Sequence, residues 1–434
     1  MSGQQAQETW SPMQAAAESG RCLYCHDAPC VRGCPAGVDI PAFVKKVHSG
    51  NWRGAARVIR EANVFGGSCA RVCPTEELCE KECSSRLLGR PIPIGALQRL
   101  AWERGAGRAR VAAPVSGKGK RAAVVGAGPA GLAAAWELRS RGWDVTVLEA
   151  GDKPGGQLDA TIPAYRLPAE VVTAEIAAIV AAGVKLRTGV RVGRDIPAAK
   201  LLAENDAVIL AAGLGGGRST EVQGQERKGI VPAEDFLAAT RRADVSDLKG
   251  KRVAVIGGGN TAMDAAVTAA RAGAARVTVV YRRTAREMPA WPREYRGALA
   301  AGAEFVWLAQ PVAFEGESTG GPVASVRCVR MRLGAPDASG RAAPEPVPGS
   351  DFTIEADLVI MALGQGPNRE VVESFGLKAD AGGRPVADES GRASHAKVFV
   401  AGDLRSGGAT VVRAVAEGKK AAGAAADDSR EENG

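Results

Sequence analysis

Short apolar runs alternate with amphipathic stretches through most of this chain. Residues 121–150, RAAVVGAGPAGLAAAWELRSRGWDVTVLEA, hold an apolar run, a glycine turn, a stretch of helical period and a second apolar run, which predicts strand, helix and strand. Residues 251–283 repeat this plan over a whole βαβ unit, so we expect two related nucleotide-binding folds. Further short strands are predicted at 206–213, 357–364 and 397–403.

The order of these segments predicts a divided domain. The strand at 397–403 is far from the first glycine turn, yet it resembles a strand of a flavin domain, so we expect the second βαβ domain to be inserted into the first. Helical patches at 41–50 and 52–62 precede both. The expected divisions are a helical domain at 1–104, a linker at 105–120, a first nucleotide domain at 121–216 and 362–434, and an inserted domain at 217–361.

Two smaller features complete the pattern. Residues 317–350 are typical of a hairpin with a loose tip rich in Gly and Pro. The acidic end DDSREENG, residues 427–434, is expected to be a frayed tail.

Composition and charge exclude several classes of protein. The formal net charge is +8, but the basic residues are scattered and no basic stripe with interleaved aromatics occurs, so no nucleic-acid partner is predicted. Anionic cofactors and an acidic protein partner account for the charge. No apolar run reaches the roughly 18 residues of a membrane helix, and the start MSGQQAQETW lacks the regions of a signal peptide. We therefore expect a cytoplasmic protein without membrane contact.

Eight of the nine cysteines precede Arg86 in two runs, C-x2-C-x4-C-x3-C-P and C-x3-C-x5-C-x3-C. Such short spacings bring thiolates together from a compact loop, as a [4Fe-4S] cluster requires, and we predict two clusters. Disulfides and structural zinc are the alternatives. The sequence has no secretory signal, which disfavours disulfides, and no second C-x2-C pair, which disfavours zinc. The lone Cys328 lies in a predicted strand and is expected to be core. The two runs are Cys22, Cys25, Cys30 and Cys34, then Cys69, Cys73, Cys79 and Cys83.

The first glycine loop has the residues of a dinucleotide site. Gly126, Gly128 and Gly131 follow a strand and open a helix, and Glu149 ends the next strand, where its carboxylate accepts from a ribose hydroxyl. In VFVAGDLRSGGATVV, Asp403 is placed to accept from ribityl hydroxyls, and the helix that begins near Thr410 directs its positive end at the flavin. An ordinary strand and turn is the alternative for that segment. The pattern favours FAD.

The second glycine loop favours a phosphorylated cofactor. Gly257, Gly259 and Ala262 repeat the fingerprint, and Tyr281, Arg282 and Arg283 stand where the first copy has Glu149. Paired guanidiniums bind a 2′-phosphate that a carboxylate repels, so NADPH is preferred over NADH. The alternative interpretation is that the two arginines are solvated surface charges. Hydride transfer needs no acid–base histidine, and we assign no catalytic residue. The expected fold is α/β, with two Rossmann-like domains, the NADPH domain inserted in the FAD domain, after an α-helical two-[4Fe-4S] domain.

With these residues assembled, the chain resembles the electron-input subunit of bacterial dihydropyrimidine dehydrogenase, and more distantly the small subunit of glutamate synthase. The likeness extends from Arg21 to about Ala422. It is carried by RCLYCHDAPC, GGSCARVCPTEELCEKEC, IPIGALQRL, GAGPAGL, IPAYRLP, GGGNTAMD and AGD.

The resemblance implies an interleaved set of cluster ligands. One cluster would be held by Cys22, Cys25, Cys30 and Cys83, and the other by Cys34, Cys73, Cys79 and the side-chain oxygen of Gln98, with Cys69 as a bystander. Gln98 and the x5 gap after Cys73 favour the pyrimidine enzyme, because glutamate synthase subunits tend to have glutamate at the corresponding position. A surface helical glutamine is the alternative.

The resemblance also implies the nucleotide contacts and the activity. We expect hydride transfer from NADPH (or NADH) to FAD, then single electrons through both clusters to an FMN-containing partner subunit that reduces uracil or thymine. A glutamate synthase-like or transhydrogenase-like input subunit is one alternative, and a non-catalytic nucleotide-binding redox sensor is another. The expected FAD contacts are Gly126, Gly128, Pro129, Ala130, Gly131, Glu149, Gln157, Arg166, Gly402, Asp403 and Thr410, and the NADPH contacts are Gly257, Gly259, Asn260, Thr261, Arg282 and Arg283.

Overall fold

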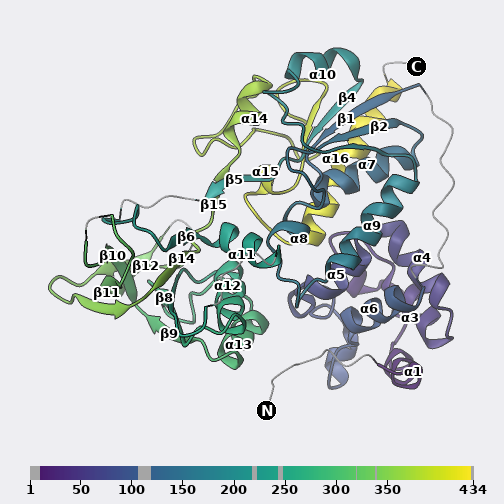
Figure 1. Ribbon diagram of the computed structural model, residues 1–434. Helices are drawn as coiled ribbons and strands as arrows, with labels where there is room; N and C mark the ends of the chain where they lie inside the picture. Colours follow the sequence, from purple (N-terminus) through teal and green to yellow (C-terminus); the bar gives the residue numbers. More distant parts are fainter. Residues whose placement is uncertain are drawn as a thin grey trace. The chain divides into compact units, whose positions relative to one another are not determined.

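The structure, a computed structural model, describes residues 10–105, 119–217, 222–242, 248–318, 320–337 and 340–431. The chain forms two compact units (Figure 1). Residues 106–118 of the expected linker lie outside the described ranges. We call Ala160–Pro163 and Gly216–Gly366 the inserted unit, and Ala6–Asp159, Ala164–Gly215 and Pro367–Gly434 the core unit.

A parallel sheet of five strands organises the core unit, in the order β16-β4-β1-β2-β3. The last strand of the chain pairs with β4, so the sheet begun by β1 is completed only after the inserted unit. This is the insertion predicted from the sequence. The strands are β1 (Arg121–Val125), β2 (Asp144–Leu148), β3 (Lys185–Arg187), β4 (Ala207–Leu210) and β16 (Val398–Val400).

Both faces of this sheet are covered, which is why β1 and β4 are continuous apolar runs. α7 and α16 lie together beside the sheet (Figure 1). The helices of this part are α7 (Pro129–Ser140), α8 (Gln157–Ala160), α9 (Ala169–Ala181), α10 (Ala198–Glu204), α14 (Arg369–Ser374), α15 (Asp403–Ser406) and α16 (Val411–Glu431).

The end of α16 corrects one expectation. Residues 427–431, predicted to fray, continue the helix. Asp427 pairs with Arg141 at 3.0 Å, and Asp428 pairs with Arg392. These ion pairs with residues far apart in sequence fix an end whose own composition is polar.

The N-terminal helices form the rest of the core unit. α4 begins where the Asn51 side chain accepts from the Gly54 amide, and it buries Ala55 and Ile59 on one face. The large buried side chains of this domain include Phe43 and Phe65. Its helices are α1 (Pro12–Gly20), α2 (Pro29–Arg32), α3 (Ile40–His48), α4 (Trp52–Ala62), α5 (Gly66–Val72), α6 (Ile94–Gly105) and the 3-10 turns η1 (Thr75–Glu77) and η2 (Ser84–Leu88).

The inserted unit has its own parallel sheet, β6-β14-β7-β8-β9, and an antiparallel sheet of β10 to β13. The predicted hairpin is present as β11 paired with β12. The helices are α11 (Ala233–Arg241), α12 (Asn260–Arg271) and α13 (Pro292–Ala300). The strands are β6 (Ile230–Pro232), β7 (Arg252–Ile256), β8 (Arg276–Tyr281), β9 (Glu304–Trp307), β10 (Ala309–Glu315), β11 (Ser325–Pro336), β12 (Ala342–Pro346), β13 (Phe352–Glu355) and β14 (Leu358–Met361).

Two adjacent strands carry the chain into and out of the longer segment of the inserted unit, Gly216–Gly366. β5 (Leu214–Gly217) leads out of the core unit, and β15 (Gln365–Pro367) leads back beside it. Among the described helices, none combines the length and the apolar character that crossing a membrane requires.

The contact between α16 and α7 depends on one glycine. A Cβ at Gly418 would lie 2.0 Å from the carbonyl oxygen of Ala130, at the start of α7. No other residue type fits there without moving one helix away from the other.

We predict that Gly418→Ala lowers the stability of the core unit by about 1–3 kcal/mol through this overlap. Thermal unfolding and the amount of FAD retained on gel filtration measure the effect. The control is Gly297→Ala on α13, where a Cβ meets nothing within 4 Å. That change should leave FAD content unaltered; equal loss in both variants would contradict the prediction.

Candidate functional site

The first glycine loop has the backbone that a dinucleotide site needs. Gly126 has a φ of 103°, and a Cβ there would lie 2.4 Å from the Ala211 carbonyl oxygen. A Cβ at Gly131 would lie 2.0 Å from the Gly126 carbonyl oxygen, so helix and strand pack closely. α7 begins after Gly128 without any side-chain cap, which leaves its first N–H groups for a phosphate. The loop therefore fits a pyrophosphate.

Glu149 lies at the carboxyl end of β2, as predicted. Its Oε2 accepts from the Ala127 amide at 2.7 Å and its Oε1 from the Gly151 amide at 2.8 Å. These bonds fix the carboxylate beside the glycine loop, where a carboxylate accepts from a ribose hydroxyl.

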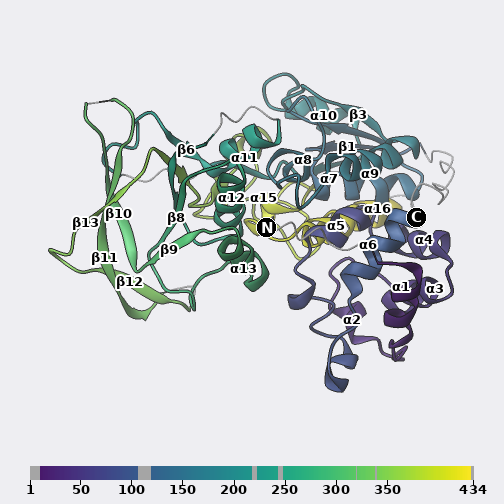
Figure 2. The ribbon, with the colours of Figure 1, turned by 60° about the horizontal axis from the view of Figure 1, so that its bottom comes forward.

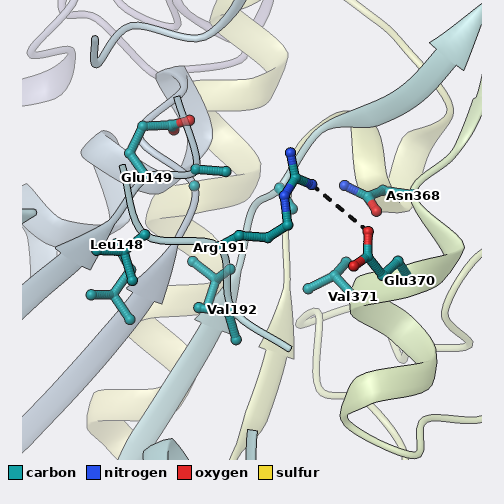
Figure 3. Close-up of a pocket in the computed structure, with 12 residues that line it drawn as sticks. Leu148, Glu149, Arg191, Val192, Asn368, Glu370 and Val371 are labelled. Carbon is teal, nitrogen blue, oxygen red and sulfur yellow. Dashed lines mark ion pairs between the residues drawn. The ribbon is translucent and has the colours of Figure 1, made fainter. Parts of the chain in front are cut away.

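A hollow at this edge adds residues that the sequence did not reveal. It is lined by Val125, Gly126, Leu148 and Glu149, and also by the segment after β3 and the start of α14 (Figure 3). Arg191 and Glu370 form an ion pair at 3.7 Å across it. Neither segment has a glycine fingerprint, so no local signal marks them. The further lining residues are Ala150, Val190, Arg191, Val192, Ala212, Asn368, Glu370 and Val371.

The segment after β16 approaches the same loop. Gly402 has a φ of 67°, and a Cβ there would lie 2.7 Å from the Cβ of Ala130. Asp403 is held by the Ala409 amide at 3.2 Å, and burial raises the pKa of its carboxyl. Thr410 caps α16 by accepting from the Arg413 amide at 3.3 Å. The structure thus brings this segment to Ala130, one of the expected FAD contacts. Gln157 begins α8, and Arg166 precedes α9.

The second glycine loop repeats this backbone in the inserted unit. Gly257 has a φ of 139°, and a Cβ there would lie 2.3 Å from the Ala362 carbonyl oxygen. A Cβ at Gly259 would meet nothing within 4 Å, and α12 begins after it without a side-chain cap. The side chain of Asn260 is engaged, since it accepts from the Trp291 amide at 2.9 Å. Thr261 and the buried Ala262 follow it on α12.

The two arginines after β8 have different surroundings. Arg282 is exposed, as Arg286 is. Arg283 is 2% exposed, and its guanidinium donates to Asp337 and, at 2.8 Å, to the Ala342 carbonyl oxygen in the hairpin. Of the predicted pair, Arg282 is the one whose charge faces solvent.

The cysteines of the two runs separate into two sets. In the first set, Cys22 lies beside Cys25 and Cys83, and Cys30 lies beside all three. Burial, and then these neighbouring thiols, raise the pKa of Cys30 to about 12. Ligation of iron supplies the cation that such crowded sulfurs need to be thiolates. Cys83 also accepts from the Ile92 amide at 3.4 Å.

The second set lines a hollow in the same domain. Cys34, Cys69, Cys73 and Cys79 line it together with Gln98, and Val412 of α16 forms part of the wall. Cys34 accepts from the amides of Val38, Ala36 and Gly37, which opposes the effect of burial on its pKa. Gln98 is 9% exposed, and its amide nitrogen donates to the Gly66 carbonyl oxygen at 2.7 Å. That bond fixes the amide group and leaves its oxygen as the group available to a metal.

The loop of the first set has an unusual backbone. Tyr24 and Ala28 have φ values of 49° and 36°, in the left-handed region that disfavours side chains. Such strain gathers where the surroundings hold a segment in place, and here the two strained residues lie on either side of the predicted ligand Cys25. None of the nine cysteines, which all lie in the described residues, forms a disulfide, and Cys328 is buried in β11 as expected.

Family models match two successive parts of the chain. Residues 2–108 match the model described as dihydropyrimidine dehydrogenase domain II, 4Fe-4S cluster, and residues 120–418 match pyridine nucleotide-disulphide oxidoreductase. The chain belongs to the pyridine nucleotide-disulphide oxidoreductase family. This membership confirms the predicted oxidoreductase with FAD, NADPH and [4Fe-4S] cofactors.

Relatives of this oxidoreductase are similar over most of its length. It is 37% identical over 91% of its chain to the NADP(+)-dependent formate dehydrogenase subunit beta of Moorella thermoacetica, of which it spans 59%. It is 36% identical to the glutamate synthase [NADPH] small chain of Escherichia coli, over 96% of this chain and 91% of that one. It is also 36% identical to the NAD-dependent dihydropyrimidine dehydrogenase subunit PreT of Escherichia coli, over 95% and 94%. The resemblance predicted from the motifs is confirmed.

A solved structure supports the fold. Mycobacterium tuberculosis FprA in complex with NADPH has a TM-score of 0.61 and 19% identity, over 72% of this chain and 86% of that chain. The likeness concerns the architecture alone, and it agrees with the α/β fold predicted from the sequence.

We predict that Gln98→Ala removes one cluster and leaves FAD bound, because the second set loses an oxygen ligand. Iron and sulfide per FAD, and the electron paramagnetic resonance of the reduced protein, measure the loss. Cys69→Ala is the matched control, since Cys69 lines the same hollow but is the predicted bystander. Loss of iron in Cys69→Ala with full iron in Gln98→Ala would reverse the assignment.

Proposed function

We propose that this oxidoreductase is an electron-input subunit. It takes a hydride from NADPH onto FAD and passes single electrons through two [4Fe-4S] clusters to a partner subunit. The observation that carries the proposal is that both cysteine sets and the first glycine loop belong to one compact unit, and Val412 of α16 lines the second set.

The two electrons that NADPH gives up both pass through these cofactors to the partner subunit. The hydride brings two electrons and one proton, NADP⁺ leaves, and the proton is released when the electrons depart one at a time through the clusters. FAD supplies the conversion from a two-electron donor to one-electron carriers. The chain itself binds and orients: the glycine loops hold the pyrophosphates, Glu149 holds a ribose, and Arg282 pairs with the 2′-phosphate.

We propose an order for the two cysteine sets. The second set shares its hollow with Val412, two residues after Thr410, an expected flavin contact. Three cysteines of the first set are partly exposed, whereas in the second set only Cys34 is partly exposed. Electrons therefore enter at the second set and leave from the first. Large apolar side chains close in sequence to cysteines of the first set are exposed, namely Leu23 (50%), Tyr24 (40%), Leu87 (89%) and Leu88 (73%).

For the acceptor we propose dihydropyrimidine dehydrogenase, with uracil or thymine reduced on an FMN-containing partner subunit. Gln98 and the x5 gap after Cys73 support this choice, and the relative named PreT is a subunit of such an enzyme. The second candidate is the same input role for another acceptor, as in the relatives named for glutamate synthase and formate dehydrogenase. A cytoplasmic location fits nine cysteines of which none forms a disulfide.

The test uses protein matured anaerobically and assayed for iron, sulfide and FAD. With NADPH it should reduce an artificial one-electron dye, and it should not reduce uracil or thymine unless the partner subunit is added. Uracil reduction by this chain alone, or absence of acid-labile sulfide after maturation in a competent host, would refute the proposal. Dye reduction also eliminates a non-catalytic sensor.

We predict that Arg282→Ala lowers the ratio of kcat/KM for NADPH to that for NADH by about 10- to 100-fold, as expected for loss of a charge-assisted bond to phosphate. Steady-state dye reduction with each donor measures this ratio. Arg283→Ala serves as the comparison: it should lower thermal stability, because Asp337 loses its buried partner, while the ratio is kept. A ratio that falls only in Arg283→Ala would show that the second arginine binds the phosphate.

A further inference from the structure

A carboxylate of the FAD-binding part reaches into the cysteine-bearing domain. Glu175 lies on α9 and is 4% exposed. Its Oε1 accepts from the Gly67 amide at 2.6 Å, and its Oε2 accepts from the Ser68 hydroxyl at 2.5 Å; the Ser68 amide lies 3.2 and 3.3 Å from the two oxygens. These amides begin α5, whose own N-cap residue, Phe65, supplies no side-chain acceptor. α5 is therefore capped from outside its own domain.

A lysine of the FAD-binding part holds the other side of the same turn. Lys419 on α16 donates to the Ala62 carbonyl oxygen at 2.6 Å and to the Ala36 carbonyl oxygen at 3.3 Å. Ala62 is the last residue of α4, where free carbonyls attract a cation. The turn from α4 to α5 thus has an ammonium at the end of one helix and a carboxylate at the start of the next. We call Glu175, Lys419 and residues 62–68 the latch.

The latch holds the backbone that carries the second cysteine set. Cys69 lies on α5, and Cys73 directly follows it. Gln98 donates to the carbonyl oxygen of Gly66, the residue before the amide that Glu175 binds. A displacement of this turn would therefore move two predicted ligands, Cys73 and Gln98.

The other ends of the latch are fixed to the first nucleotide loop. Gly418, adjacent to Lys419, lies against the Ala130 carbonyl oxygen at the start of α7. α9, which carries Glu175, also packs on α7 and α5, and α16 contacts α5 (Figure 2). Both latch residues thus project from helices seated on the phosphate-binding helix.

The burial of the Glu175 carboxylate favours a role in positioning the turn from α4 to α5, and not merely in holding the two domains together. Burial raises the pKa of this carboxyl to about 7, although bonds from Ser68 and Gly67 and the charge of Arg71 oppose the shift. Arg60 faces the same group. Burying a carboxylate is costly, and well-packed apolar side chains would join two domains at least as firmly. What the carboxylate adds is a fixed direction toward three donors.

We propose that Glu175 and Lys419 are positioning residues that fix the second cysteine set relative to the FAD site and so govern electron passage from flavin to that cluster. This inference rests on the proposed function. It concerns a single step, in which one electron leaves the reduced flavin and one cluster is reduced.

The test uses holo-protein of Glu175→Gln and Lys419→Met, each with measured FAD, iron and sulfide. After anaerobic mixing with NADPH, flavin reduction is followed by its absorbance, and cluster reduction by freeze-quenched paramagnetic resonance. We expect flavin reduction and the cluster midpoint potentials to be unchanged. Cluster reduction should slow by about tenfold, because small misplacements cost large factors in rate. The matched controls are Glu170→Gln on α9 and Lys420→Met on α16, both at exposed positions, and they should behave as wild type.

The outcomes distinguish a failure of the latch proposal from a failure of the proposed function. Wild-type cluster reduction rates in both variants would overturn the latch. If wild-type protein does not accept hydride from NADPH, the proposed function fails, and the latch is then measured after photochemical reduction of the flavin. If Glu175→Gln does not retain its clusters, the test is the rate of cluster reduction in Lys419→Arg compared with that in Lys419→Met. The arginine keeps the cation and should restore the rate, and equal slowing in both would overturn the proposal.

Discussion

The backbone contact between α16 and α7 is the constraint on which the core unit depends. Gly418 brings α16 against the carbonyl of Ala130, so one rigid helix lies on the phosphate-binding helix along its middle. Its first turn then lines the second cysteine hollow through Val412, and Lys419 reaches the end of α4. Because α16 is one continuous helix of 21 residues, the nucleotide loop and the second cysteine set contact a common element.

Much of the architecture follows from local patterns in the sequence. The two βαβ units, the insertion and the hairpin were predictable because apolar periodicity and glycine turns report on structure within a few residues. The two cysteine runs can be recognised as cluster-binding from their short spacings alone. Their regrouping, with Cys83 beside Cys22, was available only through the resemblance, because it depends on how the helices pack.

What escaped prediction was set by long-range contacts. Arg283 looked like its neighbour Arg282 in the sequence, but Asp337 in a distant hairpin binds its guanidinium. Glu175 looked like one more helical glutamate, since nothing near it in sequence shows that it caps a helix in another domain. Arg191 and Glu370 line the hollow beside Glu149 although one follows β3 and the other lies at the start of α14, segments far apart in the sequence. The acidic end continues α16 because Arg141 and Arg392 lie beside it.

The pairing of β5 with β15 makes the segment between them, most of the inserted unit, exchangeable in principle. The chain departs through one strand and returns through its hydrogen-bonded neighbour, while β4 and β16 remain joined in the sheet they share. Removing everything between the two crossings would leave ends already adjacent, with no strand of the flavin sheet lost. An exchange of this segment would therefore leave the five-stranded sheet of the core unit with all its strands.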